Sequence, residues 1–80
     1  MAVISRVIQR RRKVLGINQE EVENRVPMSY KYFSKVERGI SNPSFVSLVK
    51  IGQALETTGT KLFHEAEQEY LAMIKNDEKE

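Results

Sequence analysis

Two helix-start signals lie only eleven residues apart near the middle of the chain, and they constrain the fold more than any other feature. Asn18 is a good N-cap residue, and Glu21 three residues later completes a capping box, so a helix is expected to begin directly after Asn18. Ser29 is the second N-cap, which predicts another helix over residues 30–38 that stops at Gly39. The sequence therefore predicts two short helices joined by a tight turn.

Apolar residues recur at helical rather than alternating spacing in the segments on either side of this pair. Gly16 is expected to end a first helix, Ser44 to begin a fourth, and Thr58 or Thr60 to begin a fifth. The expected buried stripes are Ile4, Val7, Ile8 and Leu15, then Phe45, Leu48, Ile51 and Leu55, then Leu62, Ala66, Tyr70 and Ile74. This pattern predicts an all-α fold of five helices.

Length and composition indicate one small domain. Eighty residues bury a modest core, and without cysteine the fold must be held by packing alone. No apolar run is long enough to span a bilayer, and the arginine-rich start does not resemble a signal peptide, so a cytoplasmic protein is expected. We expect residues 1–75 to form the domain and residues 76–80 to form an acidic, frayed terminus.

The charged residues are unevenly distributed along the chain. Residues 1–63 carry eleven Lys/Arg and five Asp/Glu, a balance of +6, whereas residues 65–80 carry two and six, a balance of −4. A basic body suggests a polyanionic partner such as nucleic acid, although a solvated basic surface explains the same count.

The third predicted helix has two chemically different faces when its residues are placed on a helical wheel. The inner face holds Phe33, Val36 and Glu37, and the outer face holds Lys31, Ser34, Lys35 and Arg38, with Tyr30 on the flank. A short helix with a basic outer face suits the major groove of DNA, where lysine and arginine donate to guanine. An ordinary solvated helix face is the alternative.

The stretches "LGINQEEVENRV", "FSKVERGISNPSFVSLVKIGQAL" and "KLF" resemble the five-helix DNA-binding domain of the lambda-repressor and Cro family. That family includes xenobiotic-response-element regulators, antitoxins and restriction-modification controllers. The resemblance covers about residues 2–63 and implies a helix-turn-helix fold with an extended C-terminal helix. It also implies a transcriptional regulator that binds double-stranded DNA as a homodimer on a palindromic operator.

The resemblance assigns roles to individual residues. It implies that Gln19 contacts a phosphate or supports a base-reading side chain. The positions that match base-reading residues are Tyr30, Lys31 and Lys35, with Ser34 between them, and those that match backbone-following residues are Arg38, Ser41 and Asn42. Gln19 is also a good helix-starting residue and Asn42 a common turn residue, so each has a purely structural interpretation.

Three positions depart from the family pattern. Glu23 stands where alanine is usual, Pro27 where glycine is usual in the turn, and Phe33 where a branched aliphatic residue is usual. Proline fixes φ near −65° and disfavours helical geometry at the preceding residue, so we expect the second helix to end early and the turn to take another path. We expect Glu23 to stay hydrated at the edge and the recognition helix to be reset in angle.

Two charges are expected inside the domain. Arg12 lies on the apolar face of the first helix and Glu37 on the apolar face of the third. Because charges are seldom buried unpaired, we predict that they form an ion pair, which the resemblance also implies.

The stripe of the fifth helix extends beyond what one small domain covers, which predicts a homodimer. The residues expected at that interface are Leu62, Phe63, Ala66, Tyr70, Met73 and Ile74. A helix folded back on its own core is the alternative.

An enzymatic function has little support in the sequence. His64 is the only histidine and there is no cysteine, so neither a metal site nor a cofactor is expected. The rival interpretation is a helix-turn-helix fold used for protein interaction, as in an antitoxin or an anti-regulator. For a DNA-binding regulator, the sequence does not choose between repression by occupying a promoter and activation through RNA polymerase.

Overall fold

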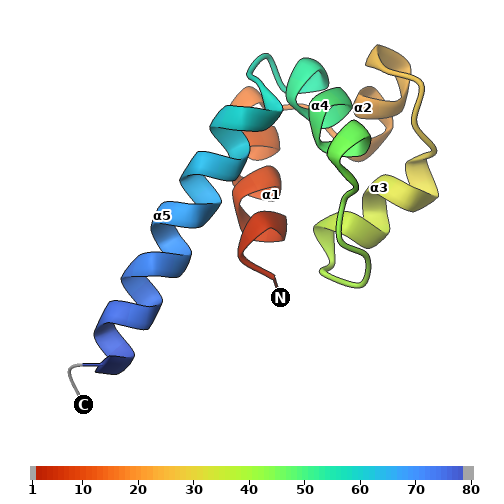
Figure 1. Ribbon diagram of the computed structural model, residues 1–80. Coiled ribbons are helices and arrows are strands. Elements are labelled where there is room, and N and C mark those ends of the chain that lie inside the picture. The colour runs from red at the N-terminus through yellow and green to blue at the C-terminus, as the bar shows by residue number, and fades with distance from the viewer. Residues whose placement is uncertain (1, 79–80) are drawn as a thin grey trace.

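Five helices make up the regular structure of residues 2–78, the part of the chain that the computed structural model describes (Figure 1). They are α1 (Val3–Leu15), α2 (Gln19–Arg25), α3 (Tyr30–Glu37), α4 (Phe45–Ala54) and α5 (Gly59–Glu78). No strand occurs within these residues, so the predicted all-α fold is confirmed. No described helix is both long and apolar enough to cross a membrane. The expected boundary after residue 75 falls inside α5, and residues 79 and 80 lie outside the described part of the chain.

Side-chain caps fix the starts of three helices. The accepting atoms are Asn18 Oδ1, 2.9 Å from the Glu21 nitrogen, Ser44 Oγ, 3.1 Å from the Ser47 nitrogen, and Thr58 Oγ1, 3.0 Å from the Lys61 nitrogen. The cap of α5 is therefore Thr58 and not Thr60. Ser29 occupies the N-cap position of α3 with extended backbone, but its side chain forms no capping hydrogen bond. The hydrogen bond implied by a capping serine at this position is thus absent from the structure.

The turn between α2 and α3 follows the path that proline imposes. α2 ends at Arg25, and Val26 has extended backbone with φ −141° and ψ 153°, as expected for a residue that precedes Pro27. No residue between these two helices has positive φ. Val26 is buried, and Lys50 Nζ of α4 lies 3.4 Å from the Pro27 carbonyl oxygen. The turn therefore reverses the chain without the glycine geometry that the family pattern uses.

The core lies where the helices converge, since α1 packs against α3 and α5 and α4 packs against α2 and α5. Its largest fully buried apolar side chains include Phe33, Ile8, Ile51 and Leu55. α4 and the start of α5 approach each other closely at Gly52, where an added Cβ would lie 2.5 Å from the backbone nitrogen of Gly59. Glycine is therefore required at Gly52 by space rather than by backbone conformation.

α5 begins in the core, runs alongside α1, and extends beyond α1 at its C-terminal end (Figure 1). Leu62 and Ala66, which the sequence places at a subunit interface, are only 2% and 8% exposed because they pack inside their own chain. The expectation is corrected for these two residues. The physical reason is that residues four apart advance by about 400° around a helix, so each step turns the stripe by about 40°. By Tyr70, which is 54% exposed, the stripe has rotated out of the core.

Candidate nucleic-acid interface

The outer face of α3 is basic and accessible, while its inner face is buried. Phe33 and Val36 have no exposed surface and belong to the core. The exposed outer residues are Tyr30, Lys31, Lys35 and the C-cap residue Arg38, with Ser34 half-buried among them. The two faces thus separate in the structure along the division drawn from the helical wheel.

A buried carboxylate ties α3 to α1. Glu37 is 1% exposed, and both of its oxygens accept hydrogen bonds from the Arg12 guanidinium, Nε to Oε2 at 2.6 Å and Nη2 to Oε1 at 3.0 Å. Arg12 Nη1 also donates to the Ile17 carbonyl oxygen at 2.9 Å. This bidentate geometry compensates both buried charges and fixes how α3 is rotated against α1.

Gln19 joins the same network from the first position of α2. Its Nε2 donates to Glu37 Oε1 at 2.7 Å. A hollow of about 300 Å³ is lined by Gln19 and Tyr30 together with Arg12, Asn18 and Glu20. The structure therefore brings Gln19 and Tyr30, which the sequence predicts as DNA contacts, into one depression where α2 meets α3.

Ser5 supplies a further restraint on α3 that the sequence analysis missed. It is buried, and its Oγ donates to the Val36 carbonyl oxygen at 2.6 Å. The signal was present, because Ser5 precedes Ile8 by three residues and Arg12 by seven, which places all three on one face of α1. A serine in that register has to find an internal acceptor.

The loop after α3 closes the C-terminal end of the helix. Gly39 has φ 75°, and the backbone nitrogens of Ile40 and Ser41 lie 3.0 and 3.3 Å from the Lys35 carbonyl oxygen. Ser41 is half-buried and Asn42 is exposed. The residues predicted to follow a DNA backbone therefore lie at the C-terminal end of α3.

Much of the basic excess of the chain is engaged inside the fold. Arg11 and Arg25 donate to backbone carbonyls at the C-terminal end of α4. Arg10 bridges Glu65 at 2.8 Å and Glu69 at 3.1 Å on α5, and its hydrogen bond lowers the pKa of the Glu69 carboxyl. The balance of +6 therefore overstates the positive charge that is available to a partner.

The cations on and beside α3, unlike the arginines engaged inside the fold, have no acidic partner among the described residues. Lys31, Lys35 and Arg38 form no ion pair with any described residue. Glu23, the unusual acidic residue of α2, is exposed and does not enter the core. The positive charge on the outer face of α3 is therefore not neutralised by any described acidic residue.

Comparison with protein families places this geometry in a known class. A family model described as "Helix-turn-helix" matches residues 8–62, well over half of the chain. This chain belongs to the Cro/C1-type helix-turn-helix family. The helix-turn-helix pair is α2 and α3, and the match ends at Leu62 in the buried part of α5.

Relatives of this helix-turn-helix chain include two bacterial regulators. It is 42% identical over 53 residues to the uncharacterized HTH-type transcriptional regulator y4dJ of Sinorhizobium fredii. The aligned region covers 66% of this chain and 69% of y4dJ. It is 45% identical over 64 residues to the HTH-type transcriptional regulator SlrR of Bacillus subtilis. The aligned region covers 76% of this chain and 41% of SlrR. The chain therefore spans less than half the length of SlrR.

Solved structures with the same architecture include the restriction-modification controller protein C.Esp1396I. The wild-type protein superposes with a TM-score of 0.77 at 28% identity, over 88% of this chain and 90% of the controller. A single-substitution mutant of the same controller gives a TM-score of 0.77 at 27% identity, over 88% of this chain and 89% of the mutant. The whole five-helix arrangement, and not only the helix-turn-helix pair, is therefore shared.

Proposed function

We propose that this chain is a sequence-specific transcriptional regulator that binds double-stranded DNA as a homodimer, with α3 in the major groove of a palindromic operator. The observation that carries the proposal is the outer face of α3, where Lys31 and Lys35 are exposed and unpaired among the described residues. The opposite face of the same helix is locked to α1 through Arg12 and Glu37. A rigid helix with free donors on its outer side has the properties that groove recognition requires.

The proposed contacts divide into base-reading and positioning groups. Lys31 and Lys35 lie one helical turn apart and donate to guanine O6 and N7, while the ring of Tyr30 packs on a thymine methyl. Gln19 lines the same hollow as Tyr30. It contacts a phosphate through the amide hydrogen that is not donated to Glu37. Ser34 lies between these base-reading residues. The remaining predicted contacts, which follow the DNA backbone, are Arg38, Ser41 and Asn42.

The relatives support regulation of transcription as the biological role. y4dJ and SlrR are both named transcriptional regulators, and C.Esp1396I is named a controller protein. A two-fold dimer places two recognition helices about 34 Å apart, one turn of B-DNA, which is the geometric reason for a palindromic site. Of the residues predicted at that dimer interface, those that are exposed or half-buried are Phe63, Tyr70, Met73 and Ile74.

The proposal is tested by DNA binding as a function of salt. Duplexes selected from a random pool are titrated by fluorescence anisotropy with the wild type, with Lys31→Ala/Lys35→Ala, and with Lys61→Ala/Lys75→Ala as a control. The control removes the same charge from exposed positions of α5. We expect the affinity of the wild type to fall as salt rises, and we expect the α3 variant to lose affinity for the selected duplexes while the control stays close to wild type.

Two results would contradict the proposal. Equal affinities for the two double variants would show that α3 does not face the DNA. A wild type without any salt-dependent affinity for DNA would instead favour a protein-interaction module, such as an antitoxin or an anti-regulator.

A further inference from the structure

A buried serine on α1 holds the backbone of α3. Ser5 is 0% exposed, and its Oγ donates to the Val36 carbonyl oxygen at 2.6 Å, across 31 positions of the chain. A serine inside a helix commonly points to solvent or hydrogen-bonds a carbonyl of its own preceding turn. Of the described residues, Ser5 alone donates a side-chain hydrogen bond to a backbone carbonyl of α3. The contact therefore belongs to the packing of α1 against α3.

The acceptor lies in the last turn of α3, at the end of the proposed recognition helix. The Gly39 nitrogen donates to the same Val36 carbonyl at 3.1 Å, and the Ile40 nitrogen donates to the Lys35 carbonyl at 3.0 Å. These two backbone hydrogen bonds form the Schellman motif that ends the helix. A carbonyl oxygen has two lone pairs, so the Val36 carbonyl accepts the Ser5 hydroxyl in addition to Gly39.

Ser5 is a stiffer link between α1 and α3 than the neighbouring ion pair. Arg12 and Glu37 join the same two helices through long side chains, each of which has several rotatable bonds. The serine side chain has a single carbon between its hydroxyl and the backbone, and its partner is a main-chain atom. The hydrogen bond consequently fixes the distance between the two backbones at Val36.

The other end of α3 has weaker polar restraints. Ser29 occupies the N-cap position without a side-chain hydrogen bond, and Lys50 Nζ lies 3.4 Å from the Pro27 carbonyl oxygen in the preceding turn. The firmly held end of the helix is therefore the C-terminal one, which carries Lys35 and Arg38.

We propose that Ser5 is a positioning residue for DNA recognition, because its hydroxyl sets the distance of α3 from α1 and thereby the place of Lys35 in the major groove. The inference rests on the proposed function. Lys35 directly precedes Val36, and its carbonyl also accepts from the Ile40 and Ser41 nitrogens, so a shift of the Val36 carbonyl carries these residues with it. A binding constellation has to be held within about 0.5 Å of its productive geometry. Base readout depends on that geometry, whereas phosphate contacts carry no sequence information.

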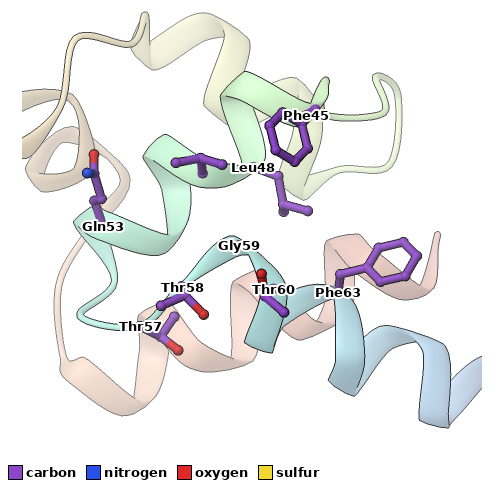
Figure 2. A pocket seen from close by; sticks show the side chains of 9 residues that line it. Phe45, Leu48, Gln53, Thr57, Thr58, Gly59, Thr60 and Phe63 are labelled. Atoms are coloured by element: carbon purple, nitrogen blue, oxygen red, sulfur yellow. The ribbon is translucent and has the colours of Figure 1, made fainter.

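The test compares the affinities of the full chain for two duplexes of equal length, a selected sequence and a scrambled one, by fluorescence anisotropy at one salt concentration. The variant is Ser5→Ala, which removes the hydroxyl and keeps the Cβ in its buried site. The control is Thr58→Ala, which removes a hydroxyl that accepts from the Lys61 nitrogen at 3.0 Å. Thr58 and Phe45 line a groove between α4 and the start of α5, with no α1 or α3 residue in its described lining (Figure 2). Urea melts give the folded fraction of each variant.

We expect the ratio of the two affinities to fall at least about 5-fold in Ser5→Ala, the smallest effect typical of one mismatched base pair, and to stay at the wild-type value in Thr58→Ala. The affinity for the scrambled duplex should be unchanged, because Lys31, Lys35 and Arg38 remain. A merely structural role predicts another result, since an unfolded fraction lowers both affinities in the same proportion and leaves their ratio unchanged. A wild-type ratio in Ser5→Ala would overturn the inference, and so would an equal fall in Thr58→Ala.

A double variant tests whether Ser5 acts through Lys35. In the Lys35→Ala background, Ser5→Ala should lower the ratio of affinities by less than it does in the wild type, because the side chain that it positions is gone. An undiminished effect in that background would also overturn the inference.

The same measurements separate this inference from the proposed function. If the wild type prefers the selected duplex and loses affinity in Lys31→Ala/Lys35→Ala, while Ser5→Ala keeps the wild-type ratio, the positioning inference fails and DNA binding through α3 stands. If the wild type binds both duplexes equally, sequence-specific recognition fails, and the inference fails with it.

Discussion

Removal of the Arg12 guanidinium should bring the domain close to unfolding. The side chains of Arg12 and Glu37 are only 12% and 1% exposed, so water barely reaches the pair. In Arg12→Ala, the Glu37 carboxylate keeps a single side-chain donor, the Gln19 amide. Leaving one member of a buried pair uncompensated costs about 3–5 kcal/mol. The whole free energy of unfolding of a chain of this length is about 4–12 kcal/mol, at about 0.05–0.15 kcal/mol per residue.

Urea unfolding followed by circular dichroism measures this loss, with all variants at one protein concentration because dimerisation shifts apparent stability. A double variant, Arg12→Met with Glu37→Leu, provides the control. It replaces the ion pair with apolar groups of similar size and should recover most of the free energy of unfolding that Arg12→Ala loses. A loss below about 1 kcal/mol in Arg12→Ala, the range of exposed ion pairs, would refute the reasoning. So would a double variant no more stable than the single one.

Three further outcomes follow from local contacts. Gly52→Ala should lose at least about 1–3 kcal/mol of stability, because its Cβ would lie 2.5 Å from the Gly59 nitrogen; an unchanged melting temperature would contradict that close approach. Pro27→Gly should lose about 0.4–1 kcal/mol in urea melts, because glycine adds entropy to the unfolded chain; a more stable variant would reveal strain at the proline. Glu69 has a pKa lowered by Arg10, so its contribution to stability is present above the unfolded-state pKa and is lost as pH falls through the folded-state value. Acidification from about pH 7 to about pH 3 should therefore lower the free energy of unfolding, measured by urea melts, more in the wild type than in Glu69→Gln. An equal loss in the two proteins would contradict this.

The parts of the fold that depend on neighbours in the chain were predictable from the sequence. Asn18 and Ser44 accept hydrogen bonds from backbone nitrogens three residues later, so the capping signal and the structure involve the same short segment. The early end of α2 follows from Pro27 alone, through its steric effect on Val26. Ser29 shows the limit of such signals, since it is exposed and its hydroxyl has water as an alternative partner.

Contacts between distant segments were harder to predict. The ion pair of Arg12 and Glu37 could be foreseen because each is a charge on an apolar face, which leaves few possible partners. The roles of Arg11 and Arg25 at the end of α4 could not be foreseen, because they depend on how the fold brings together residues that are 29 or more positions apart in the sequence. The groove beside Phe45 was hidden for the same reason: in the sequence that residue appears to belong to a buried stripe, whereas in the fold it is 83% exposed.

Gln19 connects the stability of the core to the proposed DNA face, and its chemistry can be tested directly. Its amide nitrogen carries two hydrogens, of which one serves Glu37 and the other, with the amide oxygen, remains for an outside partner. Gln19→Met keeps the length of the side chain but removes the donor, which should cost about 1.5–3 kcal/mol because the acceptor is charged. Gln19→Glu should cost more in the same urea melts, since it places a second carboxylate where the donor was, 2.7 Å from Glu37 Oε1. Equal stability of the two variants would mean that the side chain at position 19 swings out to solvent and that the link to Glu37 contributes nothing.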